Sequence, residues 1–519
     1  MLATLLSATL NGLAGRVVRV EVDVAPGLPG FTIVGLPDAA LSEARERVRG
    51  AIRNAGFVHP PRRITVNLAP ADLRKAGASL DLAIALAILL GSEQLRPAAG
   101  RWALIGELSL GGEVRHVAGM LPMVAALARR GVGRVVVPAE AITEAALVPG
   151  IDVRPVATLA EAVELVRTPR SRRVVRTPDR VELAADPAPP ESVRPGSGGG
   201  IPDIAEVRGQ LEARRALEIA LAGQHGLLLV GAPGSGKTLL ARTIPSLLPD
   251  LDDEAALAAT IVASVAGDRP VSGLIRRPPF RAPHHTISYA GLVGGGPRLS
   301  PGEVTLAHEG VLFLDELPEF GRDVLEALRQ PLEDGLVAIS RVGRAQTFPA
   351  RFTLVAAMNP CPCGFAWSSD RPCTCASGVP ERYLARVSGP LRDRIDLWVA
   401  MAPVPPSSIV AAIDPEPSSE VATRIGAARA RQAERGPVTN GHLTGRALRS
   451  ACALDTASER RAVSLAQSEG LTGRGTTRLL RVARTIADLA GEESVRGRHL
   501  DEAARFRALA SRLQLRLAG

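Results

Sequence analysis

The stretch "GAPGSGKT" at residues 231–238 follows the apolar run "HGLLLV" at residues 225–230. It matches the pattern GxxxxGK[ST], whose glycine N–H groups wrap the phosphates of a nucleotide. The apolar run predicts a buried strand, and "TLLARTIPSLL" at 238–248 predicts a helix whose N-terminus favours anions. The expected nucleotide-binding residues are Gly231, Gly234, Gly236, Lys237, which reaches the β- and γ-phosphates, and Thr238, a Mg²⁺ ligand.

A second apolar strand, "GVLFLDEL" at residues 310–317, ends in two acidic residues. We expect Asp315 to hold Mg²⁺ together with Thr238, and Glu316 to polarise the attacking water as the general base. The alternative is an exposed acidic turn, which the phosphate loop some 80 residues upstream disfavours.

Two further residues fit beside this site. The strand "FTLVAAMNP" at 352–360 ends in Asn359, whose amide is expected to orient the water, although Asn-Pro also commonly marks a turn. In "GPLRDRIDLWV" at 389–399, Arg394 is expected to be an arginine finger for the nucleotide of a neighbouring subunit. The alternative for Arg394 is a local ion pair.

The helical tail carries "LTGRGTTRLLRVARTIADLAG", with Arg478, Arg481 and Arg484 spaced by three. We favour Arg478, at the start of the helix, as a nucleotide contact. A solvated basic face is the alternative. Thr444 and Thr472 are expected helix N-caps.

The chain as a whole predicts an α/β fold class with a helical C-terminal part. Residues 1–167 alternate strand and helix patterns, including a hairpin at 102–117. Residues 168–200 are rich in Pro, Arg, Ser and Gly and predict a linker. Residues 201–405 predict a parallel α/β ATPase domain, and residues 406–519 show helical periodicity.

Four of the five cysteines form two CxC pairs, Cys361 with Cys363 and Cys373 with Cys375. Four thiolates can close a tetrahedral Zn²⁺ site, whose role would be structural because no position stays open for water. A disulfide pair and unliganded thiols are the alternatives. Cys452 stands alone and is expected to be buried packing.

The segment "FRAPHHTISYAGLVGGGPRL" at residues 280–299 separates the first two motifs. Its arginines, Arg281 and Arg298, and its glycines, 294–296, suit a loop that grips DNA phosphates inside a ring. The alternative is an insertion packed on its own subunit. No metal set is evident around His284 and His285.

The net charge of +9 is weak evidence for a nucleic-acid partner. Only two of the 62 basic residues are lysines, Lys75 and Lys237, which indicates a compositional bias toward arginine. No apolar run reaches the ~18 residues of a membrane span. The apolar N-terminal stretch has no positive residue before it, and the first charged residue is Arg16, so the stretch is a poor secretory signal. We therefore expect a cytoplasmic protein.

Taken in order, these motifs resemble an AAA+ ATPase, and more closely the magnesium-chelatase-like ComM/YifB family. The resemblance extends over almost the whole chain, in runs such as "VGLPDAALSEARERVRGAIRNAGF", "FRAPHHTIS", "LAHEGVLFLDELPEF" and "AAMNPCPCG". It implies a Lon-protease/ribosomal-S5-like N-terminal domain, a helical lid, ATP and Mg²⁺ as cofactors, a homo-hexameric ring, and branch migration of DNA. It also implies that Gln210 lies near the adenine. "SLDLAIAL" and "TGRGTT" depart from the family pattern, and the second departure weakens the role of Arg478.

Ser79 falls where Lon-type domains carry their nucleophile. A serine–lysine protease needs a lysine to accept the proton, and residues 118–131, where it would fall, contain none. Lys75 is too close in sequence, so we expect no proteolysis and interpret Ser79 as a helix N-cap.

The sequence therefore favours an ATP-driven motor that translocates on branched or single-stranded DNA. The first alternative is a protein-remodelling ATPase that uses the N-terminal domain as an inactive adaptor. A Lon-like protease is the second.

Overall fold

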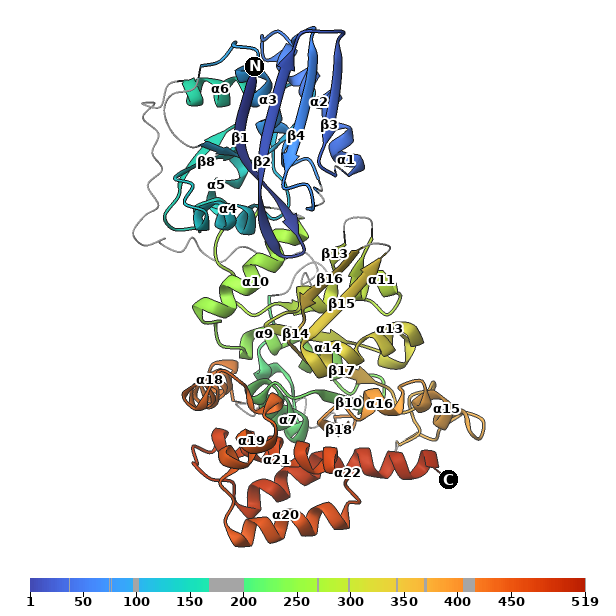
Figure 1. The fold of residues 1–519 in the computed structure, drawn as a ribbon. Coiled ribbons are helices and arrows are strands. Elements are labelled where there is room, and N and C mark those ends of the chain that lie inside the picture. Colours follow the sequence, from blue (N-terminus) through green and yellow to red (C-terminus); the bar gives the residue numbers. More distant parts are fainter. Residues whose placement is uncertain are drawn as a thin grey trace.

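The computed structural model describes residues 1–519 except 37, 74, 76, 97–101, 168–199, 268–269, 297–298, 342–343, 368–370, 405–415 and 519. Figure 1 shows three regions stacked along one axis: an N-terminal region, a central parallel sheet and a C-terminal set of helices. The predicted linker lies outside the described residues except for Gly200. The predicted boundary at 405/406 also falls in an undescribed stretch.

A seven-stranded mixed sheet forms the N-terminal region, in the order β3-β4-β2-β1-β5-β8-β9. Its strands are β1 (Leu2–Asn11), β2 (Ala14–Ala25), β3 (Gly30–Val34), β4 (Arg63–Ala69), β5 (Trp102–Leu104), β8 (Arg134–Pro138) and β9 (Asp152–Val156). Valines at every second position of β2, from Val18 to Val24, are buried, which is the two-residue period of a sheet with one face in the core.

Six helices accompany this sheet: α1 (Ala39–Ser42), α2 (Ala44–Asn54), α3 (Asp81–Gly91), α4 (Met120–Arg129), α5 (Ile142–Ala145) and α6 (Leu159–Arg167). α3 is apolar on every side and buried along nearly its whole length, so it forms the middle of the core. The likeness of this region to the Lon/S5 fold stays a prediction.

The hairpin predicted at 102–117 is only partly correct. A short antiparallel pair, β6 (Glu107–Leu108) with β7 (Val114–Arg115), forms there. Trp102–Leu104 instead joins the main sheet as β5, because its three buried residues pair in parallel with β8.

The central sheet has five strands, all parallel, in the order β11-β14-β17-β10-β18. They are β10 (Leu227–Gly231), β11 (Phe280–Arg281), β14 (Gly310–Leu314), β17 (Phe352–Met358) and β18 (Leu397–Met401). Their apolar residues enter two different core clusters, so both faces of the sheet are covered. We call the edge where the strands end the carboxyl edge and the opposite one the amino edge.

The helices around the central sheet are short. They are α7 (Leu211–Gly223), α8 (Lys237–Arg242), α9 (Ile244–Leu247), α10 (Asp253–Ala266), α11 (Tyr289–Val293), α12 (Glu303–Leu306), α13 (Arg322–Ala327), α14 (Arg329–Asp334), α15 (Val379–Ala385) and α16 (Gly389–Arg392). Two hairpins complete the region: β12 (Gly294–Gly295) with β13 (Ser300–Pro301), and β15 (Leu336–Arg341) with β16 (Arg344–Pro349).

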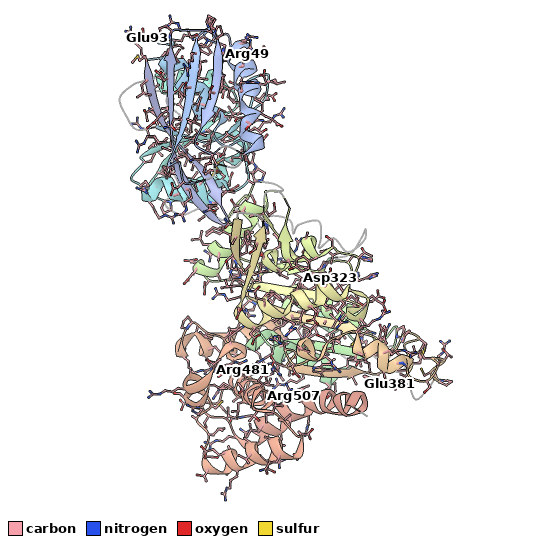
Figure 2. All side chains as sticks on the ribbon, turned by 45° about the vertical axis from the view of Figure 1, so that its right-hand side comes forward. Arg49, Glu93, Asp323, Glu381, Arg481 and Arg507 are labelled. Carbon is pink, nitrogen blue, oxygen red and sulfur yellow. The ribbon has the colours of Figure 1, made fainter. Side chains whose placement is uncertain are left out.

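The C-terminal helices are α18 (Ser418–Arg435), α19 (Gly445–Cys452), α20 (Thr456–Ser468), α21 (Gly473–Leu489) and α22 (Gly497–Ala518). Ile425, Leu479 and Phe506 share one core cluster with residues of the central sheet, so these helices pack directly on it. In Figure 2, Arg481 and Arg507 lie where the C-terminal helices meet the sheet. Thr472 caps α21 by accepting a bond from the Gly475 N–H, whereas Thr444 precedes α19 without a side-chain bond.

Helix α10 joins the N-terminal region to the central sheet (Figure 1). The buried carboxylate of Glu144 accepts hydrogen bonds from Leu121 N, Ser264 Oγ and Val271 N at 3.0, 2.5 and 3.2 Å. One side chain therefore ties two regions of the fold together. Among the helices described, none has both the length and the hydropathy that crossing a bilayer demands.

Candidate active site

The phosphate loop lies at the carboxyl edge, between the end of β10 and the start of α8. Gly234 and Gly236 have φ values of 77° and 89°, a left-handed conformation that glycine adopts without steric cost. Nothing lies within 4 Å of a Cβ placed at either position, so the loop faces open space. This backbone directs N–H groups outward at a helix N-terminus, as an anion site requires.

Lys237 folds back over this loop. Its Nζ donates to the carbonyl oxygens of Gly231 and Ala232 at 2.8 and 2.9 Å and to Asn359 Oδ1 at 3.2 Å. Burial lowers the pKa of Lys237, while the nearby carboxylates of Asp315 and Glu316 act in the opposite direction. Asn359 follows β17, which lies between β14 and β10, so the sheet order itself delivers the amide to Lys237.

Thr238 and Asp315 meet at the same edge. Thr238 Oγ1 donates to Asp315 Oδ2 at 2.7 Å, although the residues are 77 positions apart. A hydroxyl and a carboxylate beside a phosphate loop are the hard oxygen ligands that Mg²⁺ prefers. The donor set therefore fits the ion that the sequence predicts.

Glu316 comes next after Asp315 and has a left-handed φ of 53°. Its side chain is 56% exposed, and its Oε2 lies 3.3 Å from His285 Nδ1. The His285 ring also packs against His284, with ring centroids 4.1 Å apart, and edge-on against Phe320. Sequence analysis singled out the His284–His285 pair without linking it to Glu316.

These groups open into one pocket of about 350 Å³. Its lining brings together Thr238, Asp315, Glu316 and His285 with Arg242, beside apolar residues that include Phe280 and Phe313. The carboxylates of Asp315 and Glu316 thus share one space with Thr238, the last residue of the phosphate loop.

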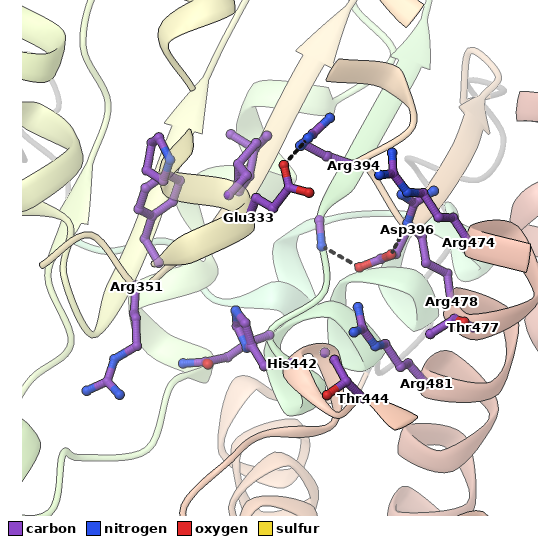
Figure 3. Close-up of a pocket in the computed structure, with 17 residues that line it drawn as sticks. Glu333, Arg351, Arg394, Asp396, His442, Thr444, Arg474, Thr477, Arg478 and Arg481 are labelled. Carbon is purple, nitrogen blue, oxygen red and sulfur yellow. Dashed lines mark hydrogen bonds and ion pairs between the residues drawn. The ribbon is translucent and has the colours of Figure 1, made fainter. Parts of the chain in front are cut away.

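Arg394 and Arg478 line a different pocket, of about 340 Å³, at the amino edge (Figure 3). Gly226, just before β10, and Asp396, just before β18, line the same pocket. The five residues of β10 separate this edge from the phosphate loop, a distance of about 16 Å. The structure therefore does not bring either arginine to the phosphate loop of its own chain.

Within this second pocket, each arginine has partners. Arg394 Nη1 donates to Pro390 O at 2.8 Å, and Nη2 forms an ion pair with Glu333. Arg478 Nε lies 3.5 Å from Asp396 Oδ1. Arg484 is fully buried and donates to the carbonyls of Ala451 and Glu493, so its role is structural.

Gln210 lies beside the phosphate loop. Its Nε2 donates to Ser235 O at 3.1 Å and to Ala402 O at 2.6 Å. This places it near the bound nucleotide that the resemblance implies.

The four clustered cysteines meet in space. All four sulfurs lie within 4.8 Å of one another, and all four are free thiols. A disulfide would need about 2.05 Å between two sulfurs, whereas the measured separations start at 3.3 Å. Cys452 is buried in α19, away from this group, as predicted.

Arg281, which the sequence suggested as a contact to DNA phosphates, has a partner within its own chain. Arg281 forms a two-pronged ion pair with Glu303, through Nε at 2.6 Å and Nη2 at 2.7 Å. This pairing favours the interpretation of the 280–299 segment as packed on its own subunit at that position. Arg298 lies outside the described residues.

The interpretation of Ser79 as an N-cap is wrong. α3 begins at Asp81, and its N-cap is Leu80. Ser79 is buried and donates across the fold to Ala8 O at 3.0 Å, while the buried Lys75 ammonium bonds to the carbonyl of Pro70. Each group is thus held by a backbone carbonyl, which does not activate a nucleophile.

Three related family models match consecutive parts of the chain. The family "Magnesium chelatase, subunit ChlI" matches residues 203–409, "Subunit ChlI of Mg-chelatase" matches 20–141, and "Magnesium chelatase, subunit ChlI C-terminal" matches 415–507.

Full-length relatives are found in several bacteria. An uncharacterized protein of Mycobacterium tuberculosis is 44% identical over 94% of this chain and 95% of its own length. The uncharacterized protein YifB of Escherichia coli is 40% identical over 96% and 95%. The competence protein ComM of Haemophilus influenzae is 40% identical over 99% of both chains.

Proposed function

The chain belongs to the magnesium-chelatase-like family of AAA+ ATPases that includes YifB and ComM, and we propose that it is an ATP-driven motor acting on DNA. ATP and Mg²⁺ are the cofactors of this family. The observation that carries the ATPase part is the meeting of Thr238, Asp315 and Glu316 in one pocket beside the phosphate loop. Action on DNA is our proposal from the resemblance to this family, one of whose members is named a competence protein.

When ATP binds, its phosphates replace the carbonyl oxygens of Gly231 and Ala232 as the partners of the Lys237 ammonium. Thr238 and Asp315 hold Mg²⁺, which neutralises charge on the phosphates when it is bound. Glu316 accepts a proton from the attacking water, Asn359 orients that water, and His285 fixes the Glu316 carboxylate.

Each nucleotide site is completed by the Arg394 side chain of a neighbouring copy of the chain. Arg394 lies at the amino edge, away from its own phosphate loop, so it can meet a γ-phosphate only in a neighbouring subunit. Arg478 lines the same pocket and is likewise separated from the phosphate loop of its own chain. A head-to-tail contact that repeats in this way forms a ring when its rotation closes, and we propose a homo-hexamer.

A structural Zn²⁺ on Cys361, Cys363, Cys373 and Cys375 is part of the proposal. Four sulfur ligands leave no open position for water, so this ion would take no part in hydrolysis.

Steady-state ATP hydrolysis with different polymers tests the function. We expect branched and single-stranded DNA to raise the rate, and an unfolded polypeptide to leave it unchanged. Glu316→Gln is the control, because it keeps nucleotide binding and removes the base. Stimulation by the polypeptide alone would contradict the DNA motor and favour a protein-remodelling ATPase.

A further inference from the structure

We propose that the loop carrying the four cysteines is a metal-clamped support for the phosphate loop, so that zinc binding sets the affinity for nucleotide. The inference rests on the proposed nucleotide site and is independent of the proposed action on DNA. We call the described residues 361–367 and 371–378 the cysteine loop.

The sulfur positions fit one tetrahedral ion. Cys361 Sγ lies 3.3 Å from Cys363 Sγ and 3.8 Å from Cys373 Sγ, and Cys363 Sγ lies 3.5 Å from Cys373 Sγ. A Zn–S bond of about 2.3 Å gives a tetrahedral S···S edge of about 3.8 Å. Cys375 lies within 4.8 Å of the other three sulfurs, so a small inward movement closes the set.

The cluster offers four sulfur ligands, a donor set that Zn²⁺ accepts in closed structural sites. Binding one Zn²⁺ exchanges four thiol protons for four Zn–S bonds and changes no oxidation state.

Contact with the phosphate loop is direct. A Cβ on Gly364 would lie 2.3 Å from Pro233 Cδ and 2.7 Å from Pro233 Cγ, so the backbone of the cysteine loop packs against the proline of "GAPGSGKT". Gly364 also has a left-handed φ of 86°. Only glycine combines that conformation with so close an approach.

The cysteine loop also follows closely after β17, the strand that ends just before Asn359. Cys361 is fully buried and follows two residues after Asn359, whose amide contacts Lys237. A metal on Cys361 therefore fixes Asn359 on one side and Pro233 on the other. Inside the cysteine loop, the Arg371 guanidinium lies 4.5 Å above the Phe365 ring.

Zinc content and nucleotide affinity, measured together on the full chain, test the proposal. We expect one zinc per chain by elemental analysis of protein purified without chelator, and Co²⁺ substitution should give the visible bands of a tetrahedral thiolate site. Cys373→Ser should lose the zinc and weaken binding of fluorescent MANT-ADP about tenfold, equivalent to about 1.4 kcal/mol. Cys452→Ala, which changes the cysteine outside the cluster, should keep both properties.

A second pair of variants guards against a Cys373→Ser protein that fails to fold. Gly364→Ala keeps all four thiols but forces a Cβ into Pro233, so it should retain zinc and still weaken MANT-ADP binding about tenfold. Gly378→Ala is the matched control, because its φ of 76° carries the same backbone penalty and its closest neighbour is 4.0 Å away.

Two results would overturn the proposal: no zinc or Co²⁺ bound by the wild-type thiols, or wild-type MANT-ADP affinity in both Cys373→Ser and Gly364→Ala. Failure of the nucleotide site itself is distinguishable, because wild-type protein would then bind MANT-ADP no better than Lys237→Ala.

Discussion

Three glutamates, Glu93, Glu309 and Glu316, combine a left-handed backbone with an acidic side chain, and of these three only Glu316 lines the pocket with Thr238 and Asp315. Few residues other than glycine adopt this conformation, and those that do cluster at functional sites. The turn aims the carboxylate into the pocket and toward His285 rather than toward Lys237 and Asn359. The imidazole is thus placed to position the base.

We expect His285→Ala to lower kcat for ATP hydrolysis about tenfold, a barrier increase of about 1.4 kcal/mol, because the Glu316 carboxylate loses its anchor. Nucleotide affinity should stay unchanged, since His285 contacts no residue of the phosphate loop. Stopped-flow nucleotide binding with steady-state hydrolysis separates the two quantities.

His284→Ala removes the ring that packs on His285 and should cause a smaller loss, because His284 Nδ1 faces Thr286 and not Glu316. In a Glu316→Gln background, His285→Ala should cause no further loss. Equal losses in both histidine variants, or additivity with Glu316→Gln, would contradict the positioning role.

The places of site residues were predictable from sequence where one short stretch carries them. Lys237 and Thr238 follow from eight consecutive residues, and Asp315 from a strand whose end is visible in the sequence. The contact of His285 with Glu316 joins positions 31 residues apart, and no local pattern encodes it. Ser79 was misread because its hydroxyl bonds across the fold to Ala8, which belongs to the first strand.

At the scale of elements, sheet order decides which side chains meet. β17 is the middle strand and has β14 on one side and β10 on the other, so the ends of β14 and β17 deliver Asp315 and Asn359 to the phosphate loop. The apolar runs predicted these strands, and Arg394 lies at the amino edge because it precedes β18, but the place of Arg478 follows only from how the C-terminal helices pack. Sequence periodicity does not contain that information.

The contact between α2 and α3 makes a prediction at the same scale. Asp81, in α3, is fully buried and paired with Arg47 of α2 at 2.7 Å. Burial raises the pKa of Asp81 to about 6 even though the Arg47 guanidinium acts to lower it. Between about pH 4 and 6 the folded protein holds a proton that the unfolded chain has released, so stability falls as pH rises through this window.

We expect Asp81→Asn to remove this fall. In the wild type, the local free energy of opening of α3 should fall between pH 4 and pH 7. The fall should exceed that of the variant by about 2–3 kcal/mol. Hydrogen exchange of α3 peptides, corrected for intrinsic rates, measures it. Asp23→Asn changes an exposed carboxylate of the same region and should leave the pH dependence intact. A wild-type profile parallel to that of Asp81→Asn would contradict the assignment.

At the scale of the whole molecule, the two pockets belong to opposite edges of the central sheet. An active site that needs both is formed only between chains. Two inactive variants should therefore complement each other: Glu316→Gln lacks the base but keeps Arg394, and Arg394→Ala keeps the base.

We expect equimolar mixing of these two variants to restore ATP hydrolysis, because about a quarter of the interfaces in a random head-to-tail ring then carry both residues. Each variant alone should be inactive, and Arg329→Ala, which breaks an exposed pair with Glu326, should behave as wild type. A mixture as inactive as its components would show that Arg394 does not act between subunits.

The most direct test of the motor is strand displacement on a labelled synthetic three- or four-way DNA junction with Mg²⁺ and ATP. We expect product that requires ATP hydrolysis and disappears in Glu316→Gln. Intact ATP hydrolysis that is indifferent to DNA, with no displaced strand on any junction, would contradict the DNA motor.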